Sequence, residues 1–577
     1  MSARSWYVAI LALLWLSACA ARQSSRQFDN NYLTGNSPML TPVSTAEFMA
    51  AEQTRSKAVS NHFEGVLQFT MAADTSHIEV LKDSFEISAD PALRVNVLPD
   101  FSFGLVQHGT ALIPVLRGPQ QTSHPYWEYI IEPGLVWQED ADGDWSRASL
   151  PFALKEKNQN CLHNGVLTFL FKNDGSISRL AYQVGSETCQ YLHINLWGIG
   201  TARYIPKNPA GADAAIAAWQ RESVNRLNVR PLHELAEKYP GFNPDKLLPP
   251  TAADDITVYG LIADGVHYRS NCPTRFGPYP YCDVIDLPSY SLAKSVFAGL
   301  AYMMMVKKWP EFEQLSISAL VPECSLPDGR WDDVTPNDLV NMMTGNYTSA
   351  GFSTDEDSAE MSQFFLAESH ADKIRFSCQA WPRQQLPATQ LVYHTTDHYL
   401  LGTAMNAFLR QKEGTQVDIF RDLIDKRIFE PLLLSQTSRH TQRSYDEVAQ
   451  PLTAYGLFFR PDDISLLANF LNSGARHAEL FRQRDFASAM FKDTSGIKRW
   501  HYARGEAYSL GFWGFDVAPY LPCSTETWIP FMSGYGGIIF ALLPNGVSYY
   551  YFTDGGHGHW KDAAVEINKI SNYCKES

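Results

Sequence analysis

A serine and a lysine three residues apart, Ser291 and Lys294, have the residue types and spacing for nucleophilic catalysis. They lie in residues 288–308, which begin with Pro-Ser and continue through apolar and small residues, as a buried helix does. One helical turn would place both side chains on one face. Since an ammonium group is costly to bury, Lys294 needs a partner or a task. A lysine kept neutral by burial can take the proton of a serine hydroxyl, and Ser291 can then attack a carbonyl carbon.

The S-x-x-K pattern alone does not identify a site, because it occurs again at residues 495–498. That second match is followed by Arg-Trp-His and has no buried helical run, so we treat it as a chance match. For Ser291 the structural alternative is a helix-capping serine followed by a lysine whose ammonium reaches solvent. The surrounding elements must decide between the two interpretations.

Segments on both sides of the Ser291 helix have the alternation of β-strands. A hairpin is predicted before the helix, three strands near the C-terminus, and a closing helix over residues 560–570. Helical and loop segments fill about 300–500. Strands at both ends of a region whose middle is helical predict one antiparallel sheet built from the two ends. The predicted strands are residues 256–262, 266–268, 509–515, 537–542 and 547–552.

Four further segments match sequence motifs that occur together, in this order, in one group of enzymes. They are T-P-N-D-L-V-N-M-M-T-G at 335–345, Y-H-T-T-D-H-Y-L-L-G at 393–402, Y-G-L-F-F-R-P-D-D-I at 455–464 and S-G-Y-G-G at 533–537. With S-x-x-K they resemble the serine β-lactamase and penicillin-binding-protein family, especially class C-like esterases and 6-aminohexanoate-dimer hydrolases. The resemblance covers about residues 255–577. It implies an α+β fold, with a β-lactamase/transpeptidase-like antiparallel sheet and helices.

The resemblance also implies catalytic roles. Tyr393 matches the family's catalytic tyrosine and would share a proton with Lys294, the pair acting as base for the attack of Ser291 and as acid for the leaving group. Without the Y-L-L-G that follows it, Tyr393 would be interpreted as a strand-edge aromatic. The backbone N–H groups of Ser291 and of Ile538, the residue after Gly537, would bind the oxyanion. Water would then hydrolyse the acyl-enzyme.

The sequence departs from the family at two of its expected substrate-binding positions, Thr395 and Tyr535. Thr395 stands where the family has Asn and offers one hydroxyl instead of an amide. Tyr535, before the glycines that end at Gly537, stands where the family has Lys or His. A tyrosine cannot supply the positive charge that binds the carboxylate of a penicillin or a peptide terminus. An ester or uncharged amide substrate is therefore favoured over β-lactams and D-Ala peptides.

The loop at 553–559 is expected to border the Ser291 cleft, because the end of the last of two antiparallel strands lies beside the start of the first. We hypothesise that His557 or His559 in this loop supplies the polar or cationic contact that Tyr535 lacks. Two histidines in a solvated, Gly-rich loop are the alternative interpretation.

The N-terminus predicts a lipoprotein. In residues 1–18, Arg4 precedes an apolar run that is too short to span a bilayer but suits a signal peptide. L-S-A-C at 16–19 resembles a lipobox, which implies cleavage before Cys19 and lipidation of its thiol; an ordinary signal peptide with an incidental Cys19 is the alternative. Ala20 resembles an outer-membrane sorting signal, so we expect a lipid-anchored cell-envelope protein on the periplasmic face of the outer membrane.

The other eight cysteines are expected to form disulfides in this oxidising compartment. Cys161 with Cys189 and Cys272 with Cys282 are candidates for local bridges. Three pairings are open for the last four cysteines; the one that keeps each bridge within one predicted subregion joins Cys324 to Cys378 and Cys523 to Cys574. No C-x-x-C occurs, so neither zinc nor another metal is expected.

The rest of the chain divides by composition. Residues 19–60, rich in polar residues and Pro, are predicted to be a flexible tether. Residues 61–208 alternate like short strands, with N-D-G at 173–175 as a hairpin turn, and predict an all-β sandwich or barrel-like domain of unknown role. Residues 209–250 predict a helical linker, and 251–577 the hydrolase domain.

Three functions remain in competition. The first is a lipid-anchored envelope serine hydrolase acting on a small-molecule or peptide-like ester or amide. The second is a D-Ala-type peptidase or β-lactamase on peptidoglycan-related substrates. The third is a non-catalytic envelope binding protein that keeps the hydrolase fold. A net charge of −15 and a pI near 5.5 argue against nucleic acid as a partner, and no cofactor is predicted.

Overall fold

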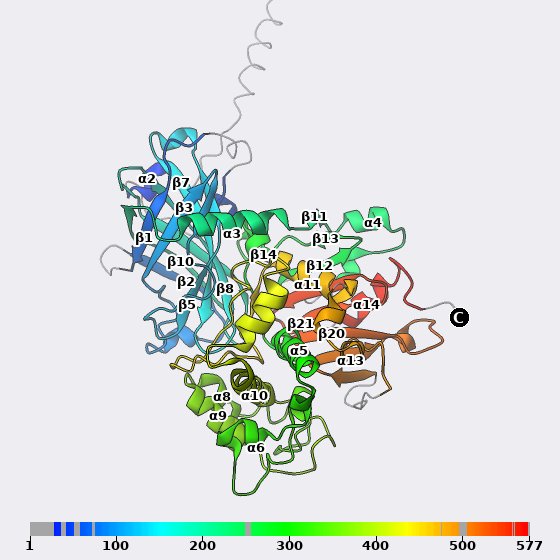
Figure 1. Ribbon diagram of the computed structural model, residues 1–577. Coiled ribbons are helices and arrows are strands. Elements are labelled where there is room, and N and C mark those ends of the chain that lie inside the picture. Colours follow the sequence, from blue (N-terminus) through cyan, green and yellow to red (C-terminus); the bar gives the residue numbers. More distant parts are fainter. Residues whose placement is uncertain are drawn as a thin grey trace, which may run out of the picture.

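The chain folds around two β-sheets that lie side by side, with helices gathered around the second (Figure 1). This computed structural model describes residues 28–35, 42–50, 58–71, 76–248, 255–474, 476–495, 505–556, 558 and 560–574. The predicted α+β class is confirmed, with an all-β region preceding an antiparallel sheet and its helices.

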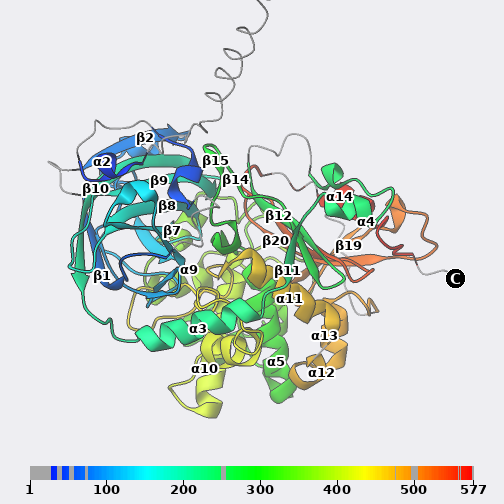
Figure 2. The same cartoon turned by 90° about the horizontal axis from the view of Figure 1, so that it is seen from above.

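The first sheet has ten strands and closes into a barrel. Its order is β1-β3-β4-β6-β7-β8-β9-β10-β2, with β5 beside β7, and an additional pairing of β1 with β10 closes the ring seen in Figure 2. Large aromatic and aliphatic side chains fill its interior. The strands are β1 (Glu64–Thr70), β2 (His77–Asp83), β3 (Phe101–His108), β4 (Ala111–Pro114), β5 (Trp127–Ile131), β6 (Gly134–Trp137), β7 (Ser146–Glu156), β8 (Leu162–Phe171), β9 (Leu180–Thr188) and β10 (Ile194–Pro206).

The second sheet has eight strands, in the order β11-β13-β12-β22-β21-β20-β19-β18. As predicted, strands from both ends of the region share this sheet, and the early strand β12 pairs with the late strand β22. The strands are β11 (Asn228–Pro231), β12 (Ile256–Ala263), β13 (Val266–Arg269), β18 (Glu506–Ser509), β19 (Phe512–Asp516), β20 (Trp528–Gly534), β21 (Ile538–Leu542) and β22 (Ser548–Thr553). Short pairs are β14 (Pro273–Thr274) with β15 (Gly277–Pro278) and β16 (Leu287–Pro288) with β17 (Phe458–Phe459).

Helices pack on both faces of this sheet. Apolar residues of α4 and α14 cover one face, and the π-helical segment η8 (Lys294–Gly299) and α11 contact the other. The α-helices are α2 (Asn30–Leu33), α3 (Ala212–Val224), α4 (Glu234–Lys238), α5 (Leu300–Lys308), α6 (Ile317–Leu320), α7 (Pro336–Val340), α8 (Met361–Leu366), α9 (His370–Gln379), α10 (Thr395–Glu413), α11 (Pro461–Ser473), α12 (His477–Leu480), α13 (Gln483–Ala489) and α14 (Trp560–Ile567).

Two connecting segments differ from the prediction. Within the predicted tether, Phe28, Tyr32 and Phe48 are buried against the outside of the barrel, where Phe28 stacks on Trp197 with ring centres 5.5 Å apart. Aromatic side chains gain more by this burial than by remaining in water. Within the predicted helical linker, α3 is helical, but β11 adds a strand to the second sheet, parallel to β13.

The C-terminal strands also differ in one place. The predicted strand at 509–515 is instead the hairpin of β18 and β19, because Leu510 and Gly511 adopt left-handed backbone angles, with φ of 49° and 92°. The strand β20 was not predicted. It lies beside β21 and becomes part of the site described below.

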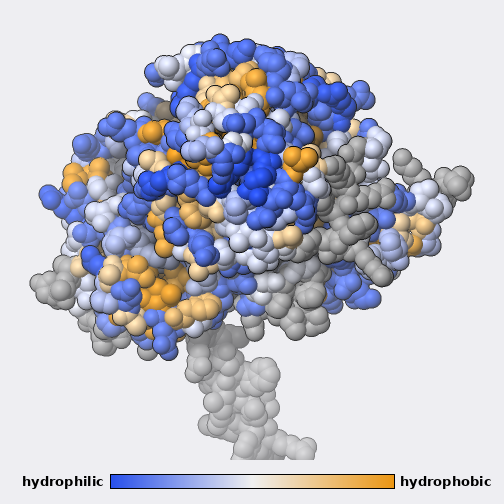
Figure 3. Space-filling model, turned by 90° about the horizontal axis from the view of Figure 1, so that it is seen from below, coloured by the Kyte–Doolittle hydropathy of each residue, from blue (hydrophilic) through white to orange (hydrophobic). Residues whose placement is uncertain are grey.

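Four disulfides are present, with the pairing that the sequence favoured. They are Cys161–Cys189, Cys272–Cys282, Cys324–Cys378 and Cys523–Cys574. Residues 1–18 and Cys19 lie outside the described residues. Among the residues that are described, none of the helices has the length and apolar character to cross a membrane. The face seen from below is mainly hydrophilic, with small hydrophobic patches scattered over it (Figure 3).

Candidate active site

Ser291 lies where an extended segment turns into a buried helix. The strand β16 ends at Pro288, Tyr290 has a left-handed backbone with φ of 41°, and helical structure follows Ser291 through η8 and α5. The sequence predicted a helix from Pro288. Pairing of β16 with β17 and the turn at Tyr290 delay its start. Residues 292–306 are all buried, as the apolar run predicted.

The Ser291 hydroxyl lies within hydrogen-bond distance of two groups that could act as base. Lys294 Nζ donates to Ser291 Oγ at 2.8 Å, and Tyr393 OH donates to the same oxygen at 2.7 Å. Lys294 Nζ also donates to Thr395 Oγ1 at 2.9 Å and lies 4.7 Å from the centre of the Tyr393 ring. Tyr393 precedes α10, and Thr395 is the first residue of that helix. The fold thus brings together four residues from two segments about 100 positions apart.

Burial lowers the pKa of the lysine in this group. Lys294 is 2% exposed, and desolvation lowers its pKa to about 8, against the opposing effect of the Glu356 and Asp397 carboxylates. A substantial fraction of Lys294 is therefore neutral near pH 8. A neutral amine within hydrogen-bond distance of a hydroxyl can accept its proton.

Burial has the opposite effect on the tyrosine. Desolvation raises the pKa of Tyr393 well above its ordinary value, with Glu356 adding to the rise. Tyr393 is therefore neutral in the resting site and donates its proton to Ser291 Oγ. This arrangement leaves Lys294 as the group that can deprotonate Ser291, either directly or through the tyrosine hydroxyl.

Glu356 is a site residue that the sequence analysis missed. Its carboxylate accepts from Thr395 N at 2.8 Å and from the Thr395 hydroxyl, so it fixes the residue that contacts Lys294. Near it, the buried carboxylate of Asp397 makes no hydrogen bond with the described residues and lies 4.0 Å from His394 Nδ1; burial raises its pKa to about 7. No motif signals Glu356, because it comes from an irregular loop.

The third motif forms the turn between β20 and β21. Gly534 pairs with Ile538 across this turn, and Gly536 and Gly537 take φ of 88° and 95°, which a side chain would strain. A Cβ on Gly534 would lie 3.0 Å from Ser289 O, so the turn packs against the residues that lead to Ser291. Ile538, the predicted oxyanion residue, begins β21 beside this contact.

Tyr535 projects from the same turn. Its side chain is 51% exposed and lines the cavity that contains Ser291. The predicted cleft-bordering loop meets this turn, because Gly556 N donates to Gly536 O at 2.9 Å. His557 and His559 lie outside the described residues, and their hypothesised role stays a prediction. The neighbouring Gly558 and Lys561 line the cavity.

The cavity at Ser291 has a volume of about 820 Å³. Ser291, Tyr393, Thr395 and Tyr535 all line it. Its charged lining residues are the acids Glu356, Asp357 and Glu506 and the base Lys561, whose Nζ lies 2.6 Å from Glu506 Oε1. Its aromatic lining residues are Tyr191, Tyr290, Phe352, Phe365, Tyr393, Tyr455, Trp513, Phe531, Tyr535 and Trp560.

The other S-x-x-K match lacks such surroundings. Ser495 Oγ donates to Asp493 Oδ1 at 2.7 Å in an exposed position, and residue 498 lies outside the described residues. Ser495 therefore serves as a natural comparison for Ser291.

No protein-family model matches the chain, and no curated protein matches its sequence. Solved structures match distantly. A protein of Bacillus anthracis described as a 6-aminohexanoate-dimer hydrolase has 14% identity and a TM-score of 0.41, covering 59% of this chain and 80% of its own. The hydrolase EstCE1, which has promiscuous acyltransferase activity, has 14% identity and a TM-score of 0.41, covering 63% and 100%. A mutant class C β-lactamase has 14% identity and a TM-score of 0.39, covering 63% and 99%.

Proposed function

We propose that the protein is a serine hydrolase that cleaves an ester or amide through an acyl-enzyme on Ser291. The observation that carries this proposal is the convergence of Lys294 Nζ and Tyr393 OH on Ser291 Oγ, at 2.8 and 2.7 Å. The lowered pKa of Lys294 supplies a base at moderately alkaline pH. A capping serine beside a solvated lysine would show neither the burial nor the second contact.

The reaction follows from these contacts. As Ser291 Oγ bonds to the carbonyl carbon, its proton passes to Lys294, directly or by way of Tyr393, and an oxyanion forms. The N–H groups of Ser291 and Ile538 would stabilise that oxyanion. The same proton then passes to the leaving alkoxide or amine as its bond to carbon breaks. Water hydrolyses the acyl ester by the reverse use of the same base.

The cavity favours a substrate without negative charge. Glu506 and Lys561 line it as an ion pair, and the carboxylates of Glu356 and Asp357 add negative charge to its wall. A carboxylate on the substrate would be repelled by these acids and would find a neutral phenol at Tyr535. The aromatic walls suit an apolar or aromatic group. We therefore place neutral or cationic esters and amides ahead of penicillins and D-Ala peptides.

The sequence also leads us to propose that a lipid anchor attaches the protein to a membrane. Lipidation of Cys19 would attach the protein to a membrane of the cell envelope, with the periplasmic face of the outer membrane as the expected site. Expression of the full chain and of its Cys19→Ser variant in a bacterium tests this. The proposal requires detergent-phase partitioning and metabolic labelling with a fatty acid in the parent chain only. Equal partitioning of both would contradict it.

A substrate panel tests the proposed activity. Neutral aryl esters of increasing acyl length, an amine-bearing ester, an uncharged amide, a D-Ala-D-Ala peptide and a penicillin are compared at one pH. Ester turnover that is abolished in Ser291→Ala and kept in the matched Ser495→Ala variant supports the proposal. Faster turnover of the D-Ala peptide or of penicillin than of the esters would favour the hypothesis of a peptidase or a β-lactamase. Binding without turnover of any substrate would favour a non-catalytic protein, which the tyrosine in the third motif also suits.

A further inference from the structure

The N-terminal barrel reaches the cavity of the proposed active site. Its loop before β8 and its loop after β9 are joined by the Cys161–Cys189 disulfide. Three residues of these loops, Gln159, Asn160 and Tyr191, line the same cavity as Ser291. The ring centre of Tyr191 lies 6.2 Å from that of Tyr535. The barrel therefore forms one wall of the site.

Asn160 contacts the residues that lead directly into the nucleophile. Its side chain is buried at 1% exposure. Its Oδ1 accepts from Tyr290 N at 2.6 Å and from Ser289 Oγ at 3.2 Å. The same oxygen also accepts from Gly456 N at 3.3 Å, and Asn160 Nδ2 donates to Leu457 O at 3.4 Å. The side-chain amide of Asn160 thus contacts the residues that follow β16 and the residues that precede β17.

The backbone at Tyr290 needs this support. A tyrosine with φ of 41° is in the left-handed region, which is strained for a residue with a side chain. Tyr290 is also buried, so its N–H would lose a strong acceptor if Asn160 were absent. The peptide that follows is the one that orients Ser291. Relaxation at Tyr290 would turn the Ser291 side chain away from Lys294 and Tyr393.

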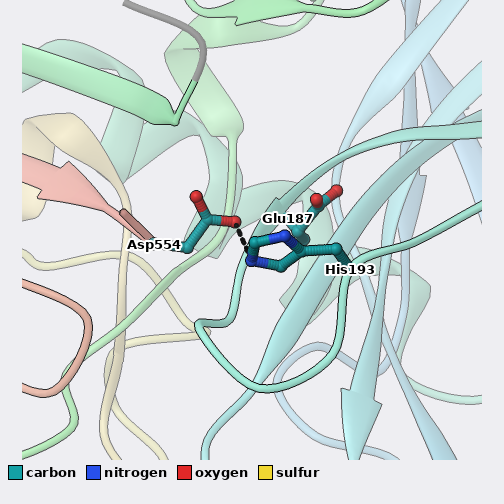
Figure 4. Close-up of side chains that lie close together, drawn as sticks. All are labelled: Glu187, His193 and Asp554. Carbon is teal, nitrogen blue, oxygen red and sulfur yellow. Dashed lines mark ion pairs between the residues drawn. The ribbon is translucent and has the colours of Figure 1, made fainter. Parts of the chain in front are cut away.

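Further contacts fix the barrel, and with it Asn160, relative to the second region. His193 of the barrel lies 3.3 Å from Asp554, which follows β22, and the two side chains face each other beside Glu187 (Figure 4). Both Glu187 oxygens accept from Arg275 of the second region, at 2.5 and 2.6 Å. These contacts are mostly buried, and they hold the barrel at both ends of the loop after β9 to Arg275 and to the residue that follows β22.

A second barrel residue makes a similar contact farther from the nucleophile. Asn164 Nδ2 donates to Asp286 O at 3.0 Å, and its Oδ1 accepts from Asp286 N at 3.2 Å. Asn164 is buried to the same extent as Asn160. It therefore supports the same segment without touching the residues adjacent to Ser291, and it provides a matched control.

We propose that Asn160 is a positioning residue for Ser291, so that the N-terminal barrel is part of the catalytic unit and not an independent domain. This inference rests on the proposed hydrolase function. Asn160 acts on the peptide before the nucleophile, and its removal lowers the rate of acylation more than it weakens substrate binding. The disulfide at Cys161 keeps the amide in place.

The test compares Asn160→Ala, Asn160→Asp and Asn164→Ala in the full chain from residue 20, using the second-order rate of labelling by a fluorophosphonate and kcat and KM on the best ester. Asn160→Ala is expected to label at least about tenfold more slowly, with kcat reduced and KM nearly unchanged. Asn160→Asp, which keeps the acceptor oxygen but loses the Nδ2 donor to Leu457 O, is expected to label at a rate between those of Asn160→Ala and the parent. Asn164→Ala is expected to lose similar thermal stability and to label at the parent rate.

Equal labelling of the Asn160→Ala and Asn164→Ala variants would overturn the inference. If Asn160→Ala does not fold, Asn160→Ser replaces it, and a parental labelling rate in that variant is equally contradictory. Labelling of the parent chain is measured first, with Ser291→Ala as its control. A parent that is not labelled refutes the proposed function itself, whereas a labelled parent with insensitive Asn160 variants refutes only the role of Asn160.

Discussion

Lys294 Nζ lies 2.8 Å from Ser291 Oγ in a site where burial lowers the pKa of the lysine to about 8. The two residues come from one helical turn, but the helix alone does not make them reactive. The start of α10 and the residues before it place Thr395 beside the ammonium and Tyr393 beside the serine hydroxyl. The loop that contains Glu356 holds Thr395 in position. Reactivity at Ser291 therefore depends on three separate segments.

The first prediction concerns pH. Because neutral Lys294 is the base and its pKa is about 8, kcat/KM is expected to rise with pH below about 8 and to level off above it. A pH profile on a neutral ester measures this. Lys373 is another buried lysine, with a pKa lowered to about 7, and Lys373→Met is expected to keep the limb near 8. If the rising part of the profile moves in Lys373→Met, the titrating group is Lys373 and not Lys294.

The second prediction concerns Glu356. Its negative charge raises the pKa of Lys294, so Glu356→Gln is expected to move the limb of the pH profile to lower pH, by about one unit. Glutamine can still accept the hydrogen bonds of Thr395, so the fold should be kept. Glu360→Gln on the same loop, outside the Ser291 cavity, is the control and should leave the profile unchanged. A shift to higher pH in Glu356→Gln would contradict the account.

The third prediction concerns Tyr393. Tyr393→Phe removes the hydroxyl that donates to Ser291 Oγ at 2.7 Å and leaves the ring in its aromatic surroundings. We expect kcat to fall by about 10²–10⁴ with little change in melting temperature, since only a proton carrier is lost. Steady-state kinetics and thermal denaturation of the same preparation check this. A variant that keeps more than half of the parental kcat would exclude Tyr393 from proton transfer.

The fourth prediction concerns stability. Burial, with Glu187 and Asp255 nearby, raises the pKa of Asp554 from its ordinary 3.8 to about 8, against the effects of Arg275 and Lys82. The folded state then binds more protons than the unfolded state between about pH 4 and 8, so stability falls as pH rises through that window.

Asp554→Asn removes this titration. From pH 4 to pH 9 the parent is expected to lose at least about 1.4 kcal/mol more of its free energy of unfolding than the variant, which is the equivalent of one unit of pKa shift. Denaturant unfolding at both pH values measures it. A variant whose stability parallels that of the parent at both pH values would show that Asp554 is ionised throughout. Burial also lowers the pKa of His193, which faces Asp554.

Much of the site could be predicted from local patterns. The apolar run around Lys294 indicated its burial, and alternating residues at the two ends of the second region indicated strands of one antiparallel sheet. These features depend on short-range periodicity, which one sequence displays directly. For the last four cysteines the sequence left three pairings open, and the structure has the one that keeps each bridge within one predicted subregion.

The parts that were missed depend on long-range contacts. Glu356 lies in an irregular loop and reaches the site only when that loop meets α10. Asn160 belongs to the barrel, which carries no recognisable motif, and its role is visible only where the barrel touches Tyr290. The burial of Phe28 and Phe48 was hidden by the polar composition of their surroundings. No periodicity predicts which surface an isolated side chain will meet.

The proposed hydrolase function requires Ser291 to be an activated nucleophile. The most direct measurement is the intact mass of the chain from residue 20 after reaction with a fluorophosphonate, followed by peptide mapping, for the parent, Ser291→Ala and Ser495→Ala. We expect a single adduct on Ser291 in the parent and in Ser495→Ala, and no adduct in Ser291→Ala. A folded parent that remains unlabelled, or an adduct that persists in Ser291→Ala, would contradict it.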